Sequence, residues 1–421
     1  MTLLALSSVL LVSAAAFGAV NAIFLRLPSA IGILIVALAA SFVVIGLDAL
    51  FPALTVEESV RSVVVGIEFS DALLEGMLGL LLFAGALHVK VADLRKEWLL
   101  VLLMATIGVG LSTAIAGFGF HWLTGAPILV ALVFGALISP TDPVAVLGVL
   151  RAARLPKSLE TKIAGESLFN DGVGYVVFLV LVGLAFPAVT DHSGGDGESA
   201  LAGAALLFAQ EAFGGAALGA ALGFVAFRVM RRIDDPPLEV LITLALAFGG
   251  YQLAVWLHVS APIMAVVAGL LIGDVGSRFG MSVETRAHVD TFWTLVDEIL
   301  NAVLFLLIGV EVFAIDLEAS FLLIGLAAIG LHLVARFSAV VVPVAVLRPF
   351  SPEMEDGLTR IMTWGGLKGG ISVALVLALP DTEWKPVMLT ACYMVVLFSI
   401  IVQGLTVGRL ARKLGGEPDF I

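Results

Sequence analysis

Five ionisable residues stand inside long apolar stretches of the chain, where ionisable side chains are rare and most able to do chemistry. The acids are Asp142 in SPTDP, and Glu166 and Asp171 in GESLFND; the bases are Arg336 in LVARFS and Lys368 in GGLKGG. At the depth of a bilayer each unpaired charge costs about 2.5–3.5 kcal/mol, so five would cost about 15 kcal/mol, as much as the folding free energy of an ordinary domain. These side chains must therefore pair, be solvated or bind an ion.

GESLFND predicts two neighbouring helix faces with different roles. Residues four apart share a face, so Ser167 and Asp171 lie on one face and Glu166 and Asn170 on the next, about 100° away. A carboxylate, a hydroxyl and freed backbone carbonyls are hard oxygen ligands that suit a small alkali cation, whereas soft metals and haem favour Cys, Met or His. Glu166 is freer to meet a base, and Arg336 is the deepest one. A small-residue packing face is the alternative, although two acids would be costly there.

SPTDP predicts a broken helix. Pro140 and Pro143 lack N–H donors and crowd the carbonyls of Ala136 and Ser139, which frees those oxygens. Broken backbone at membrane depth is tolerated only where protein or a watery cavity surrounds it. Asp142 then occupies the N-cap position with Pro143 as the first helical residue. A helix cap alone would explain this aspartate, but an ionisable cap in mid-membrane favours a functional role.

GGLKGG predicts a second interruption. Four glycines surround Lys368 and weaken the helix around it, although tight helix packing also explains glycines: Gly365, Gly366, Gly369 and Gly370. Because the two interrupted spans lie seven spans apart, they cross the membrane in opposite directions, as in transporters built from inverted repeats. Lys368 and Asp142 would then balance the charges of the facing half-helix ends.

The composition requires a membrane protein. Of 421 residues 60% are hydrophobic and 13% charged, and the mean hydropathy is +1.12. These values exclude a soluble enzyme and a disordered chain, and a net charge of −12 with one cysteine excludes a nucleic-acid binder and a disulfide scaffold. Thirteen apolar spans are predicted at about 2–24, 29–47, 68–89, 98–121, 126–150, 161–188, 200–229, 238–257, 260–274, 291–313, 319–347, 357–380 and 386–408. Residues 51–70 fit two alternatives, an interfacial helix or an extension of the third span.

The spans form one membrane-embedded domain without a soluble part. Spans 1–6 make repeat one, about 1–188; span 7, about 200–229, is a connector; and spans 8–13 make repeat two, about 238–413. Alternate loops on one side hold 18 of the 22 basic residues, so this side is cytoplasmic, the N-terminus is outside and the C-terminus is inside. The first span is expected to stay uncleaved, because no basic residue precedes it. We expect a multi-pass protein of the plasma (cell inner) membrane.

Several other polar residues are weaker candidates for an ion pathway. Asp71 and Glu75 open the third span, and Asp297, Glu298 and Asn301 lie in the tenth. The six histidines show no metal-ligand spacing, and His332 is the deepest of them. No cofactor is expected.

At SPTDP, GESLFND and GGLKGG together, the chain resembles the NhaP-like sodium/proton exchangers of the monovalent cation/proton antiporter superfamily, over nearly its full length. The resemblance implies that Asp171 binds a cation or a proton in competition, with Ser167 and the Thr141 backbone as further ligands of Na⁺. It also implies a Glu166–Arg336 ion pair, a homodimer and an elevator-like movement of the core. Asn170 stands where the electrogenic branch has a second aspartate.

Two residues depart from the pattern of that family. Lys368 replaces the more usual arginine of the glycine motif, and Ala84 occupies a position where many relatives carry an acid. The second departure leaves the contribution of the third span open.

The predicted function is secondary exchange of Na⁺ or Li⁺ for H⁺, with lipid and the exchanged ions as the expected partners. The five deep charges sum to −1, and Asn170 cannot titrate, so one proton or one monovalent cation at Asp171 neutralises the core. Exchange should therefore be electroneutral and 1:1. K⁺/H⁺ exchange is the nearest alternative, because oxygen ligands do not reveal the size of the site. A cation channel would need a continuous pore, and an intramembrane hydrolase would need a nucleophile beside a base; both are more distant alternatives.

Overall fold

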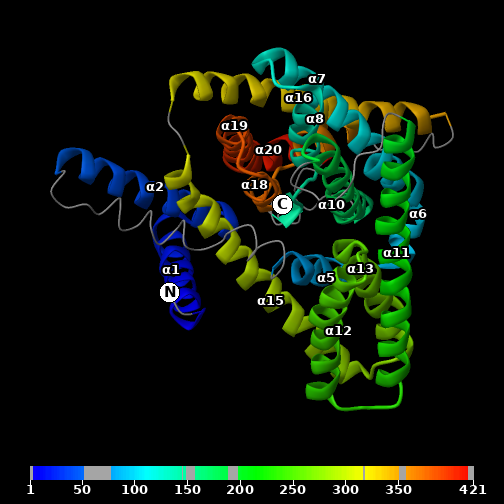
Figure 1. Cartoon of the computed structure of the whole chain (residues 1–421). Coiled ribbons are helices and arrows are strands. Elements are labelled where there is room, and N and C mark those ends of the chain that lie inside the picture. The colour runs from blue at the N-terminus through cyan, green and yellow to red at the C-terminus, as the bar shows by residue number, and fades with distance from the viewer. Residues whose placement is uncertain are drawn as a thin grey trace.

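The computed structural model describes residues 3–51, 77–144, 146–147, 157–187, 198–315, 318–349 and 357–415, and within these ranges the chain is helical with no strand (Figure 1). The other residues lie outside this description, among them the candidates Asp71 and Glu75 and all of the open segment 51–70 except Phe51. Each of the thirteen predicted spans overlaps at least one described helix.

The first half of the chain forms helices whose bounds are α1 Leu3–Val20 with the π-helical turn η1 Asn21–Leu25, α2 Ser29–Leu50, α5 Leu78–His88, α6 Val91–Leu103, η3 Met104–Gly108, α7 Val109–Thr124, α8 Ile128–Leu137 and α10 Lys157–Ala185. The second half forms α11 Glu198–Met230, α12 Pro236–Trp256, α13 Ala261–Leu271, η4 Ile272–Gly276, α14 Ser277–Phe279, α15 Val283–Val310, η5 Glu311–Ala314, α16 Ala319–Leu347, α17 Leu358–Trp364, α18 Gly370–Leu377, α19 Lys385–Leu397, η6 Phe398–Gln403 and α20 Gly404–Gly415. Helices α6, η3 and α7 are continuous, as are α19, η6 and α20.

Eight helices of the described part are long and apolar enough to cross a membrane, and three more are shorter but apolar: Leu78–His88, Ile128–Leu137 and Ala261–Gly276. The multi-span helical fold is therefore confirmed, but the count of thirteen is not. Helices α6 and α15 begin at Val91 and Val283, seven or eight residues before the predicted spans. Their first turns carry charged residues such as Asp93 and Glu284, and a hydropathy argument cannot detect a helix that continues into the polar surface.

Two hydrophobic clusters hold the helices together. One joins buried residues of α2, α7, α8, α16, α18 and α19 with the second half of α15. The other joins α5, α11, α12 and α13 with the first half of α15, around the fully buried Trp293. The Trp293 ring packs 4.8 Å from that of Phe83, and its indole N–H donates to Thr243 Oγ1 at 2.9 Å. Helix α15 runs diagonally between the two groups of helices (Figure 1).

Candidate functional site

The fifth predicted span is interrupted at SPTDP. Helix α8 ends at Leu137, Ser139 N–H bonds back to Ala136 O at 3.1 Å, and helical backbone resumes at Val144. Asp142 Oδ1 accepts the Val144 N–H at 2.8 Å, which is the N-cap geometry expected of an aspartate before Pro143.

The twelfth predicted span is interrupted at GGLKGG, and the two interruptions cross. Helix α17 ends at Trp364 and α18 begins at Gly370. Asp142 N–H donates to Leu367 O at 2.8 Å, so the two extended segments are hydrogen-bonded to each other. Helices α8 and α18 also pack together. Residues more than 220 positions apart in the sequence thus form one polar centre inside the bundle.

Lys368 neutralises the carbonyl end of α8. Its Nζ donates to Ser139 O at 2.7 Å and to Pro140 O at 2.9 Å, and the residue is 1% exposed. Ser139 O is one of the carbonyls that the prolines were predicted to free. A helix C-terminus carries partial negative charge, so a buried ammonium at this position is favourable.

Glycine at two positions of GGLKGG makes room for charged groups. A Cβ on Gly369 would lie 2.2 Å from Asp142 Oδ2, and a Cβ on Gly366 would lie 2.0 Å from Arg336 Nε. Both distances are far below van der Waals contact, so these glycines admit the carboxylate and the guanidinium. Helix packing alone does not account for them.

Replacing Lys368 by Met should destabilise the protein. The variant would leave Ser139 O and Pro140 O without their donor in the interior, which we expect to cost about 3 kcal/mol. Lys385 is a matched control, because its Nζ donates to Leu379 O at 2.7 Å near the end of α18 but is partly exposed. Lys385→Met should cost less than about 1 kcal/mol. Loss of heat stability by the purified variants measures the difference, and equal losses would contradict the role given to Lys368.

Glu166 and Arg336 form a buried, two-pronged ion pair. Arg336 Nη2 lies 2.9 Å from Glu166 Oε2, Nη1 contacts Oε1, and the side chains are 5% and 3% exposed. Arg336 Nη2 also donates to Met362 O, in the last turn of α17, at 2.8 Å. The guanidinium therefore neutralises the carbonyl end of a second half-helix, as Lys368 does for α8. No pattern in the sequence predicts this contact.

Ser167, Asn170 and Thr141 form a hydrogen-bonded group beside Asp171. Thr141 Oγ1 lies 3.0 Å from Ser167 Oγ and accepts from Asn170 Nδ2 at 2.8 Å, while Thr141 N–H donates to Asn170 Oδ1 at 3.2 Å. Asn170 thus fixes the Thr141 backbone, and it shares this partner with Ser167 although the two were predicted on neighbouring faces. All three residues are buried.

Asp171 lies beside this hydrogen-bonded group, but one of its carboxylate oxygens has no hydrogen-bond partner. It is 5% exposed, and its Oδ1 is buried without a hydrogen-bond partner in the described structure. Asp142, Lys368 and Glu166 lie within electrostatic range of it. A buried acceptor with no donor favours a proton or a cation.

The structure also buries polar residues outside this group, of which His332 was the one expected to lie deep. His332 is 1% exposed with Nε2 unpartnered, Glu239 is fully buried, and Glu311 is 4% exposed. Lys162 pairs with Glu97 at 3.6 Å. Glu97, Lys162 and Glu239 stand near the polar ends of their helices, so their sequence context resembled that of surface residues.

Two of the weaker candidates of the tenth predicted span, Asp297 and Asn301, contact each other on α15. Asn301 Nδ2 donates to the backbone oxygen of Asp297 at 2.8 Å and to its Oδ1 at 3.0 Å, so the two residues form a local pair on one helix. Asp297 also lies within electrostatic range of Asp142. It therefore stands nearer to the crossing than a residue of the membrane interface would.

The chain is similar in sequence to known proteins over most of its length. The pattern of the family "Sodium/hydrogen exchanger, transmembrane" matches residues 9–413. The Na⁺/H⁺ antiporter NhaP of Pseudomonas aeruginosa is 46% identical over 411 residues, which are 95% of this chain and 94% of that protein. The Na⁺/H⁺ antiporter NhaH of Halobacillus dabanensis is 36% identical over 363 residues, 86% of this chain and 87% of that protein.

A solved structure has the same fold. It is the sodium proton antiporter MjNhaP1 from Methanocaldococcus jannaschii at pH 8, which superposes with a TM-score of 0.76 over 99% of this chain and 100% of that chain. The two sequences are 19% identical, so this likeness concerns the arrangement of the helices.

Proposed function

Because the chain belongs to the transmembrane sodium/hydrogen exchanger family, we propose that it exchanges one Na⁺ for one proton across the membrane, with both ions competing for Asp171. The protein is a transporter, not an enzyme. Na⁺/H⁺ exchange follows from the family and from the activity named for its relatives; the stoichiometry and the site residues are our proposal.

One observation supports the proposed site. Four of the five deep charged residues form an ion pair or hydrogen bonds, whereas Asp171 has a carboxylate oxygen without a partner. Arg336 binds Glu166, and Lys368 binds two backbone carbonyls. Asp142 Oδ1 accepts the Val144 amide. Asp171 Oδ1 is left as a buried acceptor without a partner. We assign to this oxygen the proton or the Na⁺, with Ser167 Oγ and oxygens of Thr141 completing the shell and Asn170 and Asp142 holding Thr141 in place.

Competition at one carboxylate explains coupling. A proton on Asp171 removes the negative charge that would hold Na⁺, and bound Na⁺ disfavours protonation, so the site holds one or the other. Either ion brings the five deep charges from −1 to zero. A neutral loaded core can then move across the membrane in both directions, whereas the empty core carries an uncompensated charge at a cost.

Proteoliposomes containing a pH-sensitive dye test this proposal. Na⁺ and Li⁺ should drive proton release at a rate that does not change with a valinomycin-set membrane potential, and no transport current should appear on a solid-supported membrane. A current that scales with turnover would show that a second group titrates. Asp297→Asn, which removes the nearby acid, should leave the exchange electroneutral if Asp297 takes no part.

The same assay separates the alternatives. Proton release driven by K⁺ but not by Na⁺ would favour K⁺/H⁺ exchange. Proton flux without any added cation, or a cation current that needs no proton gradient, would favour a channel. The relatives named above are Na⁺/H⁺ antiporters, and none of the observations favours K⁺.

We further propose a plasma-membrane location with the N-terminus outside and the C-terminus inside, from the distribution of Lys and Arg. The crossing of two broken helices supports the inverted repeats about 1–188 and 238–413, with α11 as the connector. A homodimer, as the resemblance implies, belongs to the same proposal. Labelling of single cysteines introduced near the two termini, from each side of the membrane, tests the orientation.

A further inference from the structure

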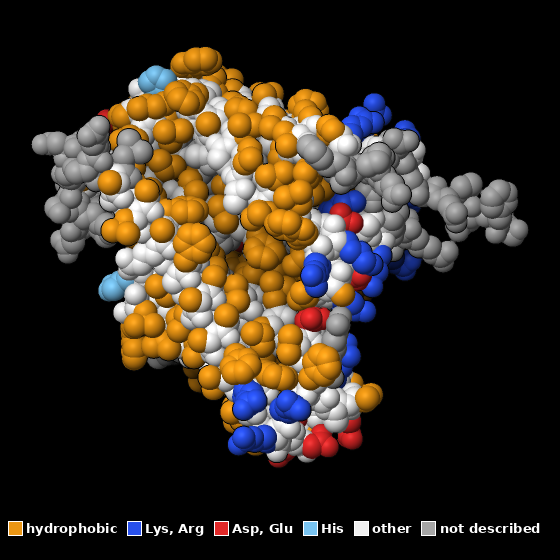
Figure 2. Space-filling model, turned by 90° about the vertical axis from the view of Figure 1, so that its right-hand side faces the viewer, with side chains coloured by type: hydrophobic (Ala, Val, Ile, Leu, Met, Phe, Trp, Pro, Cys, Tyr) orange, Lys and Arg blue, Asp and Glu red, His pale blue; other side chains and the backbone are white. Residues whose placement is uncertain are grey.

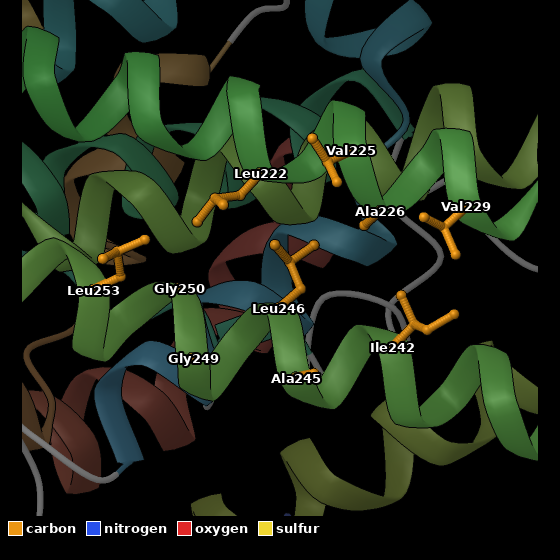
Figure 3. Close-up of a pocket in the computed structure, with 10 residues that line it drawn as sticks. All are labelled: Leu222, Val225, Ala226, Val229, Ile242, Ala245, Leu246, Gly249, Gly250 and Leu253. Atoms are coloured by element: carbon orange, nitrogen blue, oxygen red, sulfur yellow. The ribbon is translucent and has the colours of Figure 1, made fainter.

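An apolar groove of about 320 Å³ lies between α11 and α12 (Figure 3). Its walls include Val225 and Val229 of α11 and Ile242 and Leu253 of α12. At 1.5 Å per residue, the stretch 242–253 is about 16 Å long. This length is about half of the roughly 30 Å hydrocarbon layer, so the groove extends over about one leaflet.

Glycine leaves the groove open. Gly249 and Gly250 lie along its α12 wall (Figure 3). A Cβ built on Gly249 meets nothing within 4 Å. Val225 and Phe248 nearby are 58% and 54% exposed, so the groove opens onto the apolar outer face of the bundle.

Three arginines stand at one end of this groove. Arg228 lies in the last turn of α11, between the lining residues Ala226 and Val229. Arg231 and Arg232 come directly after the helix, where the Arg232 N–H bonds to Val229 O at 2.9 Å. No ion pair joins them to a carboxylate of the described residues. Figure 2 shows basic side chains gathered below the hydrophobic face.

Three acids follow these arginines in the sequence, and none forms an ion pair with them within the described residues: Asp234, Asp235 and Glu239. Glu239 is fully buried, with both carboxylate oxygens unpartnered. Asp234 Oδ1 accepts from Thr285 Oγ1 at 3.4 Å, and Asp235 Oδ1 caps α12 by accepting Leu238 N–H at 3.3 Å. Arg228 Cζ lies 5.9 Å from the centre of the Phe224 ring, a cation–π contact that leaves the N–H groups of its guanidinium free to bind an anion. All three arginines are thus available to an anion at the end of an apolar groove.

We propose that this groove binds an anionic glycerophospholipid of the surrounding bilayer, with an acyl chain along Val225, Val229 and Ile242 and the phosphate on the three arginines. Basic residues at the end of a cleft between membrane helices suit an anionic headgroup, and the apolar length suits one acyl chain. A second copy of the chain fits this face less well. In a two-fold symmetric contact across the groove, the arginines of both copies would meet at the same depth and repel.

Native mass spectrometry of delipidated protein, titrated with phosphatidylglycerol and phosphatidylcholine of identical chains, tests the headgroup. Each arginine near an anionic headgroup contributes about fivefold in affinity, so phosphatidylglycerol should bind at least about tenfold more tightly. A variant with Arg228→Gln, Arg231→Gln and Arg232→Gln should bind both lipids within about twofold. If that variant folds poorly, the wild-type preference should still shrink at high salt. Equal binding of the two lipids by wild type would overturn the proposal.

Filling the groove tests the acyl chain. Gly249→Leu places a side chain in open space, so it should weaken both lipids about tenfold while the protein stays folded. Gly330→Leu on α16 is the matched control, because Gly330 is also exposed and its Cβ also meets nothing within 4 Å. It should change binding less than twofold. If Gly249→Leu left lipid binding intact, or instead converted a dimer to a monomer, the lipid assignment would be wrong.

Discussion

Asp171→Asn should reduce Na⁺-driven proton release to the level of empty liposomes while the protein stays folded. The amide is nearly isosteric with the carboxylate, but it can neither carry a proton nor balance a cation. Asp171 Oδ1 has no hydrogen-bond partner in the described structure, so the substitution breaks no hydrogen bond at that oxygen and removes a costly buried charge. We therefore expect the melting temperature to stay the same or to rise.

Dye-based exchange and thermal unfolding of the same preparation measure both halves of this prediction. Asp381→Asn is the control, because the Asp381 side chain is 98% exposed and pairs with Lys385 at the surface. It should leave exchange and stability unchanged. Wild-type-like exchange by Asp171→Asn would show that the exchanged ion binds elsewhere. Loss of exchange together with loss of folding would show that Asp171 is structural.

The local geometry of the site could be predicted from the sequence where a residue acts on its own neighbours. Pro140 and Pro143 remove donors from a helix whatever surrounds it, so the break and the Asp142 cap follow from SPTDP. The freed Ser139 carbonyl follows in the same way. The spacing within GESLFND places Ser167 and Asn170 on neighbouring faces of α10, but it does not predict that both contact Thr141.

What could not be predicted is where one broken helix meets the other. The reach of Lys368 to Pro140 O and of Arg336 to Met362 O depends on how distant segments cross. The sequence could not decide whether the glycines around Lys368 interrupt the helix or allow tight helix packing. Only the crossing shows that Gly366 and Gly369 face a guanidinium and a carboxylate. Apolar periodicity likewise gave the approximate spans, but not the charged first turns of α6 and α15.

Arg336→Met should destabilise the protein by roughly 3–5 kcal/mol, because it leaves Glu166 buried with an uncompensated charge. Both carboxylate oxygens of Glu166 bind the guanidinium, and the side chains are almost fully enclosed. The variant also removes the donor to Met362 O at the end of α17. A large fall in melting temperature and in the yield of folded protein is therefore expected. An Arg336→Met protein as heat-stable as wild type would show that the pair contributes nothing.

The double variant Glu166→Leu with Arg336→Met separates the ion pair from the capping of α17. Replacing a whole buried pair by apolar side chains of similar size is often neutral, so the double variant should recover most of the stability that Arg336→Met loses. The part not recovered measures the contact with Met362 O, for which we expect about 1–3 kcal/mol. Recovery with exchange intact would mean that the pair only supports the fold. Recovery without exchange would mean that Glu166 and Arg336 also hold α10 and α17 in the register that Asp171 needs. No recovery would place the whole effect of Arg336 on the carbonyl end of α17.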